Sequence, residues 1–252
     1  MFETVLSEMV ADGIRIITLN RPAKLNAMNA LLIRDVAEAF VHANEDNETK
    51  VIIFTGAGRA FCAGDDLQEH EHPESAEKAR ELVESIQRCT TAIVEGPKPV
   101  VGAINGWAVG GGFEWAINCD FPIWSESAKG FFPEVSWGLF VTGGVTTLLP
   151  ALVGLNKARE MLFLGERYSA EELARIGVAW RVVPDDDLMG CALATAEKLA
   201  QLPQQAVQAM KRVLNETAMT SLQAAMARET EATIDGFMDK ETTGRISAFG
   251  KE

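Results

Sequence analysis

Two glutamates stand close to glycine and proline residues in a pattern that could support acid–base chemistry. Glu114 follows the three consecutive glycines 110–112 after one intervening residue, and Glu134 directly follows Pro133. Two carboxyl groups whose pKa values differ can act as base and acid in one reaction. The two glutamates are therefore candidate catalytic residues.

Two glycine-containing turns could place backbone N–H groups beside these carboxyl groups. The turn at Gly64-Asp65 and the turn at residues 110–112 each follow a predicted strand. Glycine allows a substrate to approach the backbone closely, and the first N–H groups of a helix bind negative charge. Two such donors on one oxygen would stabilise an oxyanion, and the loss of one donor typically costs about 2.7–4 kcal/mol. Taken alone, the glycines at residues 110–112 equally fit tight packing of a strand against a helix.

Short strands and helices must position these turns. Apolar runs predict buried strands at residues 50–56, 99–104, 120–124 and 179–183, and segments 3–8 and 13–20 predict a hairpin. Helical spacing predicts helices after the candidate N-cap Asn29 and near residues 76–94, 113–119, 146–153, 156–164, 169–176, 187–201, 204–215 and 221–238. This alternation of strands and helices predicts an α/β protein.

Composition and charge exclude several classes of function. The chain has 252 residues, of which 47% are hydrophobic, and its formal net charge is -13. Nucleic-acid binding needs a cationic surface, and no segment is apolar enough to span a bilayer, so neither partner is expected. The N-terminal residues do not resemble a signal peptide, and the four cysteines are scattered. We therefore expect free thiols and a soluble, cytoplasmic enzyme.

The segment His70-Glu71-His72 resembles part of a metal site, because two imidazoles flank a carboxylate. No third well-placed ligand is evident, and a solvated loop explains the segment. His42 has no partner motif, and we expect it on the surface of a helix. The sequence therefore predicts no metal.

Several ordered motifs resemble the crotonase (enoyl-CoA hydratase/isomerase) superfamily. They are Asn20-Arg21-Pro22 with Asn26-Ala27-Met28, the run 61–67, Lys98-Pro99 with Asn105-Gly106 and residues 110–114, Pro133-Glu134, and the segment 165–183. The resemblance implies a crotonase-like spiral of ββα units over residues 1–195 and a C-terminal helical trimerisation region over residues 196–252. It also implies an acyl-CoA thioester substrate, a homotrimer or dimer of trimers, and no cofactor apart from the coenzyme A of the substrate.

The resemblance also assigns roles to individual residues. The backbone N–H groups of Asp65 and Gly111 would form the oxyanion hole, Glu114 would orient and deprotonate water, and Glu134 would deliver a proton to the α-carbon. The path of the CoA nucleotide and pantetheine would be lined by Lys24, Leu25, Ala27, Ala63, Asp66 and Leu67. The family position at Asp65 is often alanine. A carboxylate facing the enolate would be repulsive, so we expect this side chain to point outward and to cap the following helix.

The chain departs from the family pattern in two places. The segment 138–144 lacks the proline of family hydratases and is one residue shorter, and five aromatic residues lie near the two glutamates: Trp107, Trp115, Phe131, Phe132 and Trp137. Aromatic residues in such stretches usually pack in the core. Any that line the pocket would suit an aromatic, cyclic or otherwise atypical acyl group.

The residues leave three functions open. The first is a 2-enoyl-CoA hydratase, and the second is another reaction of the superfamily through the same enolate: isomerisation, dehydration, thioester hydrolysis or carbon–carbon cleavage. The third is acyl-CoA binding without catalysis. A Rossmann dehydrogenase is disfavoured because the glycines do not form G-x-G-x-x-G, and a serine hydrolase is disfavoured because G-x-S-x-G is absent.

Overall fold

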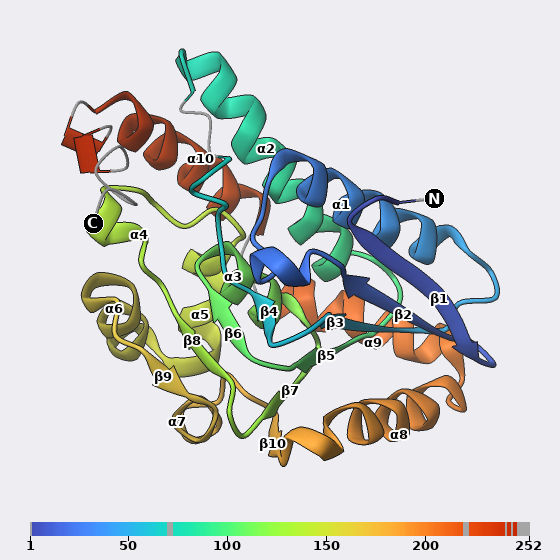
Figure 1. Cartoon of the computed structure of the whole chain (residues 1–252). Coiled ribbons are helices and arrows are strands. Elements are labelled where there is room, and N and C mark those ends of the chain that lie inside the picture. The colour runs from blue at the N-terminus through green and yellow to red at the C-terminus, as the bar shows by residue number, and fades with distance from the viewer. Residues whose placement is uncertain (1, 70–72, 219–221, 240, 243, 246–252) are drawn as a thin grey trace.

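Two β-sheets form the centre of the protein in the computed structural model, which describes residues 2–69, 73–218, 222–239, 241–242 and 244–245 (Figure 1). The first sheet has the order β1 (Val5–Ala11), β2 (Ile14–Leu19), β3 (Val51–Gly56), β5 (Val100–Ile104), β7 (Phe121–Ser125) and β10 (Arg181–Val183). Only β1 is antiparallel to its neighbour. The second sheet has the order β4 (Ala60–Cys62), β6 (Trp107–Val109), β8 (Lys129–Phe131) and β9 (Tyr168–Ser169).

The chain alternates between the two sheets before each helix. β3 and β4 precede α2 (Ala76–Val94), β5 and β6 precede α3 (Gly111–Asn118), and β7 and β8 precede α4 (Glu134–Trp137). Each new strand pairs in parallel with the corresponding strand of the preceding unit. This repetition is the predicted spiral of ββα units, so the α/β fold class is confirmed.

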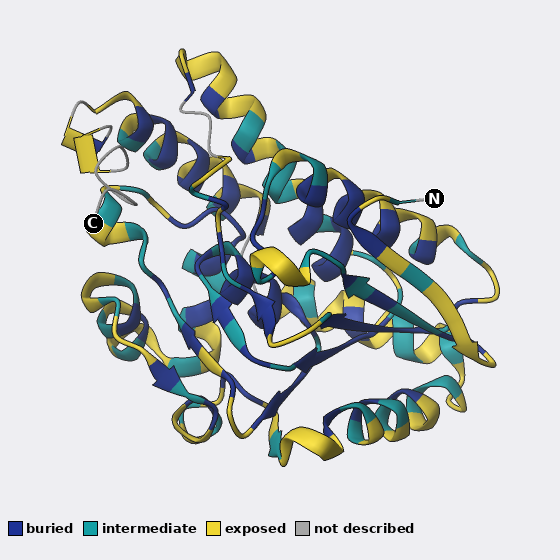
Figure 2. Ribbon diagram, viewed as in Figure 1, coloured by how far each residue is buried: buried dark blue, intermediate teal, exposed yellow. Residues whose placement is uncertain are grey.

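Helices cover both faces of the first sheet, which explains why its central strands are continuous apolar runs. Along β3, Val51 and Ile53 pack in the cluster that contains α8 (Leu188–Ala200), whereas Ile52 and Phe54 pack in the larger cluster with α1 (Ala30–Glu45). Alternate side chains thus face opposite layers, as expected in a strand. Figure 2 shows these inner strands buried and the outer helix faces exposed.

The second half of the chain is helical and returns to the core. Its helices are α5 (Val145–Val153), α6 (Leu155–Leu164), α7 (Ala170–Arg175), α8, α9 (Gln204–Ala218) and α10 (Leu222–Met238). α10 packs beside α2, where Ile234 and Phe237 contact Ala79 and Leu82 (Figure 1). The proposed division between residues 195 and 196 falls inside α8, and this division stays a prediction.

Several local expectations are confirmed. The hairpin turns after Ala11, the Asn29 side chain caps α1 by accepting from Leu32 N–H, and His42 is exposed on α1. The strands β4 and β6 lie just before the two predicted glycine turns and were not predicted, because three residues are too few to show a strand pattern. The four cysteines are free, and the segment 70–72 lies outside the described residues. Among the described helices, none is both long and apolar enough to cross a membrane.

Candidate active site

The second glycine turn begins α3 and brings Glu114 and Glu134 to one place. Gly110 has φ +52°, a conformation that favours glycine, and a Cβ atom there would lie 2.6 Å from Glu134 Oε1. Glu114 lies in the first turn of α3, and its N–H donates to Gly110 O at 2.9 Å. The turn therefore requires glycine both for its backbone conformation and for the close approach of Glu134.

The first glycine turn is held by Met28. Met28 N–H donates to Gly64 O at 2.7 Å, and Asp66 N–H donates to Met28 O at 2.8 Å. In this parallel bridge the N–H of Asp65 itself is directed away from Met28. A Cβ atom on Gly111 would collide with the Met28 methyl group, so the Met28 side chain touches the second turn. Met28 thus links the two turns.

One cavity of about 600 Å³ contains the four predicted catalytic positions. Its lining includes Asp65, Gly111, Glu114 and Glu134, and the predicted CoA-path residues Leu25, Ala63 and Leu67. The remaining lining is mostly apolar and comes from α2, β6, β8, the segment 136–142 and α10. Such a mainly apolar cavity with a few convergent polar groups is the usual form of a small-molecule site.

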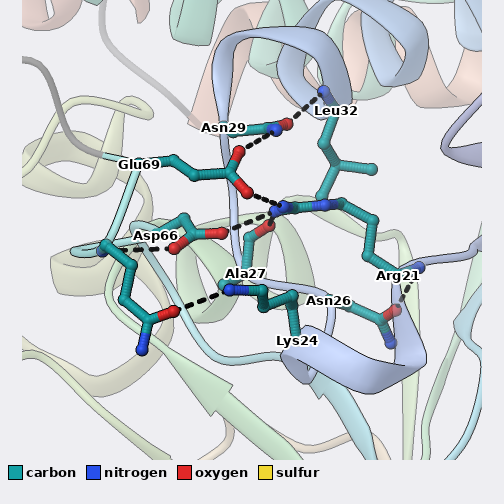
Figure 3. Close-up of polar contacts among 9 residues, drawn as sticks. Arg21, Lys24, Asn26, Ala27, Asn29, Leu32, Asp66 and Glu69 are labelled. Atoms are coloured by element: carbon teal, nitrogen blue, oxygen red, sulfur yellow. Dashed lines mark hydrogen bonds and ion pairs between the residues drawn. The ribbon is translucent and has the colours of Figure 1, made fainter.

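The other three predicted CoA-path residues lie beside the cavity lining and join the two loops that flank it. Figure 3 shows Arg21 reaching from the loop before α1 to Asp66 and Glu69, with N–O distances of 2.9 Å to each. Ala27 O also accepts from Arg21, and Lys24 Nζ donates to Gln68 Oε1 at 2.6 Å. Asp66 is buried, so its ion pair with Arg21 fixes this wall.

Asp65 departs from one expectation. It is exposed and also lines the cavity, and the outward direction of its carboxylate stays a prediction. The prediction that it caps the next helix is wrong, because the Ser75 side chain caps α2 by accepting from Lys78 N–H at 3.3 Å. Ser75 directly precedes the first residue of α2, whereas Asp65 is separated from that helix by the whole connecting loop.

The carboxyl group of Glu114 is buried and hydrogen-bonded. Thr142 N–H donates to Oε1 at 2.9 Å and Thr142 Oγ1 donates to Oε2 at 3.2 Å. Burial raises the pKa of Glu114 to about 7, the nearby Glu229 carboxylate raises it as well, and the bonds from Thr142 oppose both. Because its donors favour the ionised form, Glu114 is suited to accept a proton near neutral pH.

Glu134 has a different environment. Among the described residues, none offers a hydrogen-bond partner to its buried Oε2 atom. Burial raises its pKa well above the usual value, and the neighbouring Glu114 raises it further. A buried carboxyl oxygen without a donor favours the protonated form, so Glu134 is suited to give up a proton.

The aromatic residues near the glutamates divide between core and cavity. Trp115 and Phe132 are buried in the main core, as expected, whereas Trp107, Phe131 and Trp137 line the cavity. Within the described part of the chain, no cluster of three or more His, Cys, Asp or Glu residues is placed to hold a metal ion.

Three residues that hold the site were missed from the sequence: Arg21, Thr142 and Glu229. Arg21 lies within the quoted motif Asn20-Arg21-Pro22, but its spacing gives no sign of the distant carboxylates. Thr142 lies in the unusually short segment 138–144, whose departure from the family pattern was the only available signal. Glu229 lies on a helix far along the chain, and no local pattern connects it with Glu114.

Known proteins with a similar sequence and fold belong to one family. The family model described as enoyl-CoA hydratase/isomerase matches residues 10–249. The crotonyl-CoA hydratase of Syntrophomonas wolfei is 33% identical over 98% of this chain and 95% of its own. The 1,2-epoxyphenylacetyl-CoA isomerase of Escherichia coli is 34% identical over 91% of this chain and 88% of its own. The crystal structure of an enoyl-CoA hydratase/isomerase from Mycobacterium paratuberculosis has a TM-score of 0.91 and 31% identity, covering 98% and 99% of the two chains.

Proposed function

The chain belongs to the enoyl-CoA hydratase/isomerase family, and we propose that it is a 2-enoyl-CoA hydratase. One observation carries this proposal. Two carboxyl groups line one cavity, and their surroundings favour an ionised Glu114 and a protonated Glu134. Hydration needs both a base for water and an acid for carbon in the same site.

The proposed reaction proceeds through an enolate. The backbone N–H groups of Asp65 and Gly111 bind the thioester oxygen. Glu114 accepts a proton from water as the water oxygen bonds to the β-carbon, and the electrons of the double bond move toward the thioester. Negative charge then develops on the oxygen held by the two N–H groups. Glu134 donates a proton to the α-carbon, which completes the 3-hydroxyacyl thioester.

The coenzyme A portion would follow the wall formed by the two joined loops. Leu25, Ala63 and Leu67 line the cavity directly, and Lys24, Ala27 and Asp66 stand next to it. We propose that Asp66 acts through its ion pair with Arg21, which holds this wall in place. Coenzyme A is part of the substrate, and no separate cofactor is proposed.

A second candidate is another reaction of the family on an aromatic or cyclic acyl-CoA. Five aromatic side chains line the cavity, namely Trp107, Phe131, Trp137, Phe140 and Phe237, which favours a flat or bulky ligand. The similarity to the relative named 1,2-epoxyphenylacetyl-CoA isomerase supports the same alternative. The two candidates use the same enolate and differ in whether water is added.

Product analysis separates the two candidates. Crotonyl-CoA is incubated with the protein in water enriched in oxygen-18, and the products are identified by mass spectrometry. A hydratase yields 3-hydroxybutyryl-CoA with the label at the β-carbon. A panel of 3-enoyl and arylacetyl thioesters tests the alternative, and turnover confined to these esters without uptake of the label would contradict the proposal.

Two substitutions test the assigned roles. Glu114→Gln and Glu134→Gln each remove one acid–base group while keeping the side-chain shape, so we expect hydration to fall by roughly 10²–10⁴-fold. The control is Glu126→Gln, which changes an exposed glutamate after β7 and should leave turnover unchanged. Circular dichroism checks the fold of each variant. Wild-type turnover in either site variant would refute the roles.

A further inference from the structure

Glu229 is a fully buried carboxylate on α10, and no residue in the described part of the chain forms an ion pair with it. It accepts hydrogen bonds from Gly144 N–H at 2.8 Å, Thr146 N–H at 2.8 Å and Thr146 Oγ1 at 2.6 Å. These donors all belong to the beginning of α5. Three donors on one carboxylate favour its ionised form and oppose the effect of burial, which raises the pKa of Glu229.

α5 depends on this contact because it lacks a cap of its own. Its N-cap residue is Gly144, which has φ +73° and carries no side chain that could accept a bond. The first N–H groups of a helix need acceptors, and a carboxylate there also interacts favourably with the helix dipole. Glu229 supplies this cap from a helix that begins more than seventy positions later in the chain.

The same short segment that Glu229 holds also holds Glu114. Thr142 donates twice to the Glu114 carboxylate, and the backbone of Gly143 forms a further hydrogen bond with it. A Cβ atom on Gly143 would lie 2.6 Å from Glu114 Oε2, so the segment packs directly on the carboxylate. Residues 142–146 therefore bridge two buried carboxylates.

We propose that Glu229 is a positioning residue for Glu114, because it anchors the segment 142–146 that orients the catalytic carboxylate. This inference rests on the proposed function and deepens it. Glu229 is not one of the described residues that line the cavity. It therefore acts on Glu114 through the segment 142–146 and through its own charge, and it does not contact the substrate. The C-terminal helix α10 thereby becomes part of the catalytic apparatus.

The charges that face this region are carboxylates. Glu114 of α3 and Glu134 of α4 face it, and α5 carries no charged residue. The charged residues of α2 and of the rest of α10 are exposed: Glu77, Lys78, Arg80, Glu81, Glu84, Arg88, Arg228, Glu231 and Asp235. The Glu229 charge thus acts on Glu114 without a buried cation among these residues to offset it, and its removal should lower the pKa of Glu114.

The test compares Glu229→Gln with Glu231→Gln. Glutamine can accept from Gly144 or from Thr146, but its amide group cannot serve both, and it carries no charge. Glu231 lies on the same helix, is exposed and pairs with Arg80. For crotonyl-CoA hydration we expect Glu229→Gln to lower kcat tenfold or more with KM changed less than twofold, and to move the acid limb of the pH profile to lower pH. Glu231→Gln should match the wild type.

Hydrogen exchange of residues 138–146 gives a readout that is independent of turnover. We expect exchange in Glu229→Gln to be at least tenfold faster than in Glu231→Gln. If residues 138–146 of the wild type exchange slowly but the protein hydrates no thioester, the proposed function is wrong. The comparison of exchange rates between the two variants still tests whether Glu229 anchors this segment. If Glu229→Gln does not fold, Thr146→Val removes one donor and should lower kcat several-fold at constant KM. Equal kcat, pH profile and exchange in Glu229→Gln and Glu231→Gln, or wild-type kcat in Thr146→Val, would overturn the proposal.

Discussion

Glu114 and Glu134 have the same side chain and differ in what surrounds it. Thr142 gives Glu114 two donors, whereas none of the described residues gives one to Glu134 Oε2. Burial raises both pKa values. Glu114 has the two bonds from Thr142 to oppose this effect, whereas Glu134 has only a bond from its own backbone. The proposed roles of Glu114 as base and Glu134 as acid rest on this difference.

The pH dependence of the reaction follows from these two environments. Glu114 must be ionised and its pKa is raised to about 7, so kcat/KM should rise as the pH increases through this value. Glu134 must be protonated and its pKa is also raised, so kcat/KM should fall again at higher pH. The apparent values belong to the pair, because the two groups interact. Steady-state hydration of crotonyl-CoA measures this profile, and a rate that is constant through neutral pH would contradict it.

The sequence predicted the candidate catalytic residues of the cavity better than their hydrogen-bond partners. Glycine turns and carboxylates are local signals, and Gly111, Asp65, Glu114 and Glu134 do line one cavity. The Glu114 contact with Thr142 depends on how a later segment folds back over α3. Such contacts between distant segments leave no trace in residue spacing.

At the scale of elements, the buried side chain of Lys211 joins α9 to the core through hydrogen bonds. Lys211 Nζ donates to Asp120 Oδ2 at 2.7 Å, to Ile93 O at 2.8 Å and to Lys98 O at 3.0 Å. Its side chain is 6% exposed, so the interactions take place largely out of water. These bonds join α9 to the end of α2 and to the segment before β5.

Removing this lysine should therefore destabilise the protein. Lys211→Met keeps much of the apolar stem but removes the donor from two carbonyl groups and the charged partner from Asp120, which keeps the bond from Val100 N–H. We expect a cost of about 3 kcal/mol in the free energy of unfolding. Arg212→Gln is the control, because Arg212 forms an exposed pair with Glu216 at 3.7 Å that contributes less than about 1 kcal/mol. Denaturant titration measures both. A Lys211→Met variant as stable as Arg212→Gln would show that the contact is dispensable.

Element prediction succeeded where a pattern was long enough to recognise. β3 and β5 are continuous buried runs. The helix predicted near residues 169–176 is α7, which begins with a capping box of Ser169 and Glu172. β4 and β6 have three residues each, lie just before the glycine turns and were not predicted as strands. The second sheet is built from such short strands, so it could not be predicted from periodicity.

At the scale of the whole molecule, the order of motifs along the chain predicted the spiral correctly. The ββα repeat itself is visible only in the pairing of strands, since each unit has a different sequence. The resemblance also predicts that the C-terminal helices join copies of the chain. Apolar side chains are exposed on α9, where Met210 is 62% and Leu214 is 55% exposed, and such side chains are often covered in an assembly.

We therefore predict that the protein forms a trimer or a dimer of trimers. Light scattering during size-exclusion chromatography should give three or six times the chain mass of 27.3 kDa. The double substitution Met210→Glu and Leu214→Glu places charge on the exposed apolar face and should reduce this mass. Lys198→Glu, at an exposed polar position of α8, is the control. A wild-type particle with the mass of one chain would refute the prediction.

The central claim is that two main-chain amides and two carboxyl groups converge on one thioester. A crystal structure with butyryl-CoA, a saturated ester that cannot be hydrated, tests it most directly. The account predicts that the thioester oxygen lies about 2.7–3.1 Å from the N atoms of both Asp65 and Gly111. It also predicts that the α-carbon faces Glu134 and the β-carbon faces Glu114. A thioester bound away from either amide, or with one glutamate out of reach of these carbons, would contradict it.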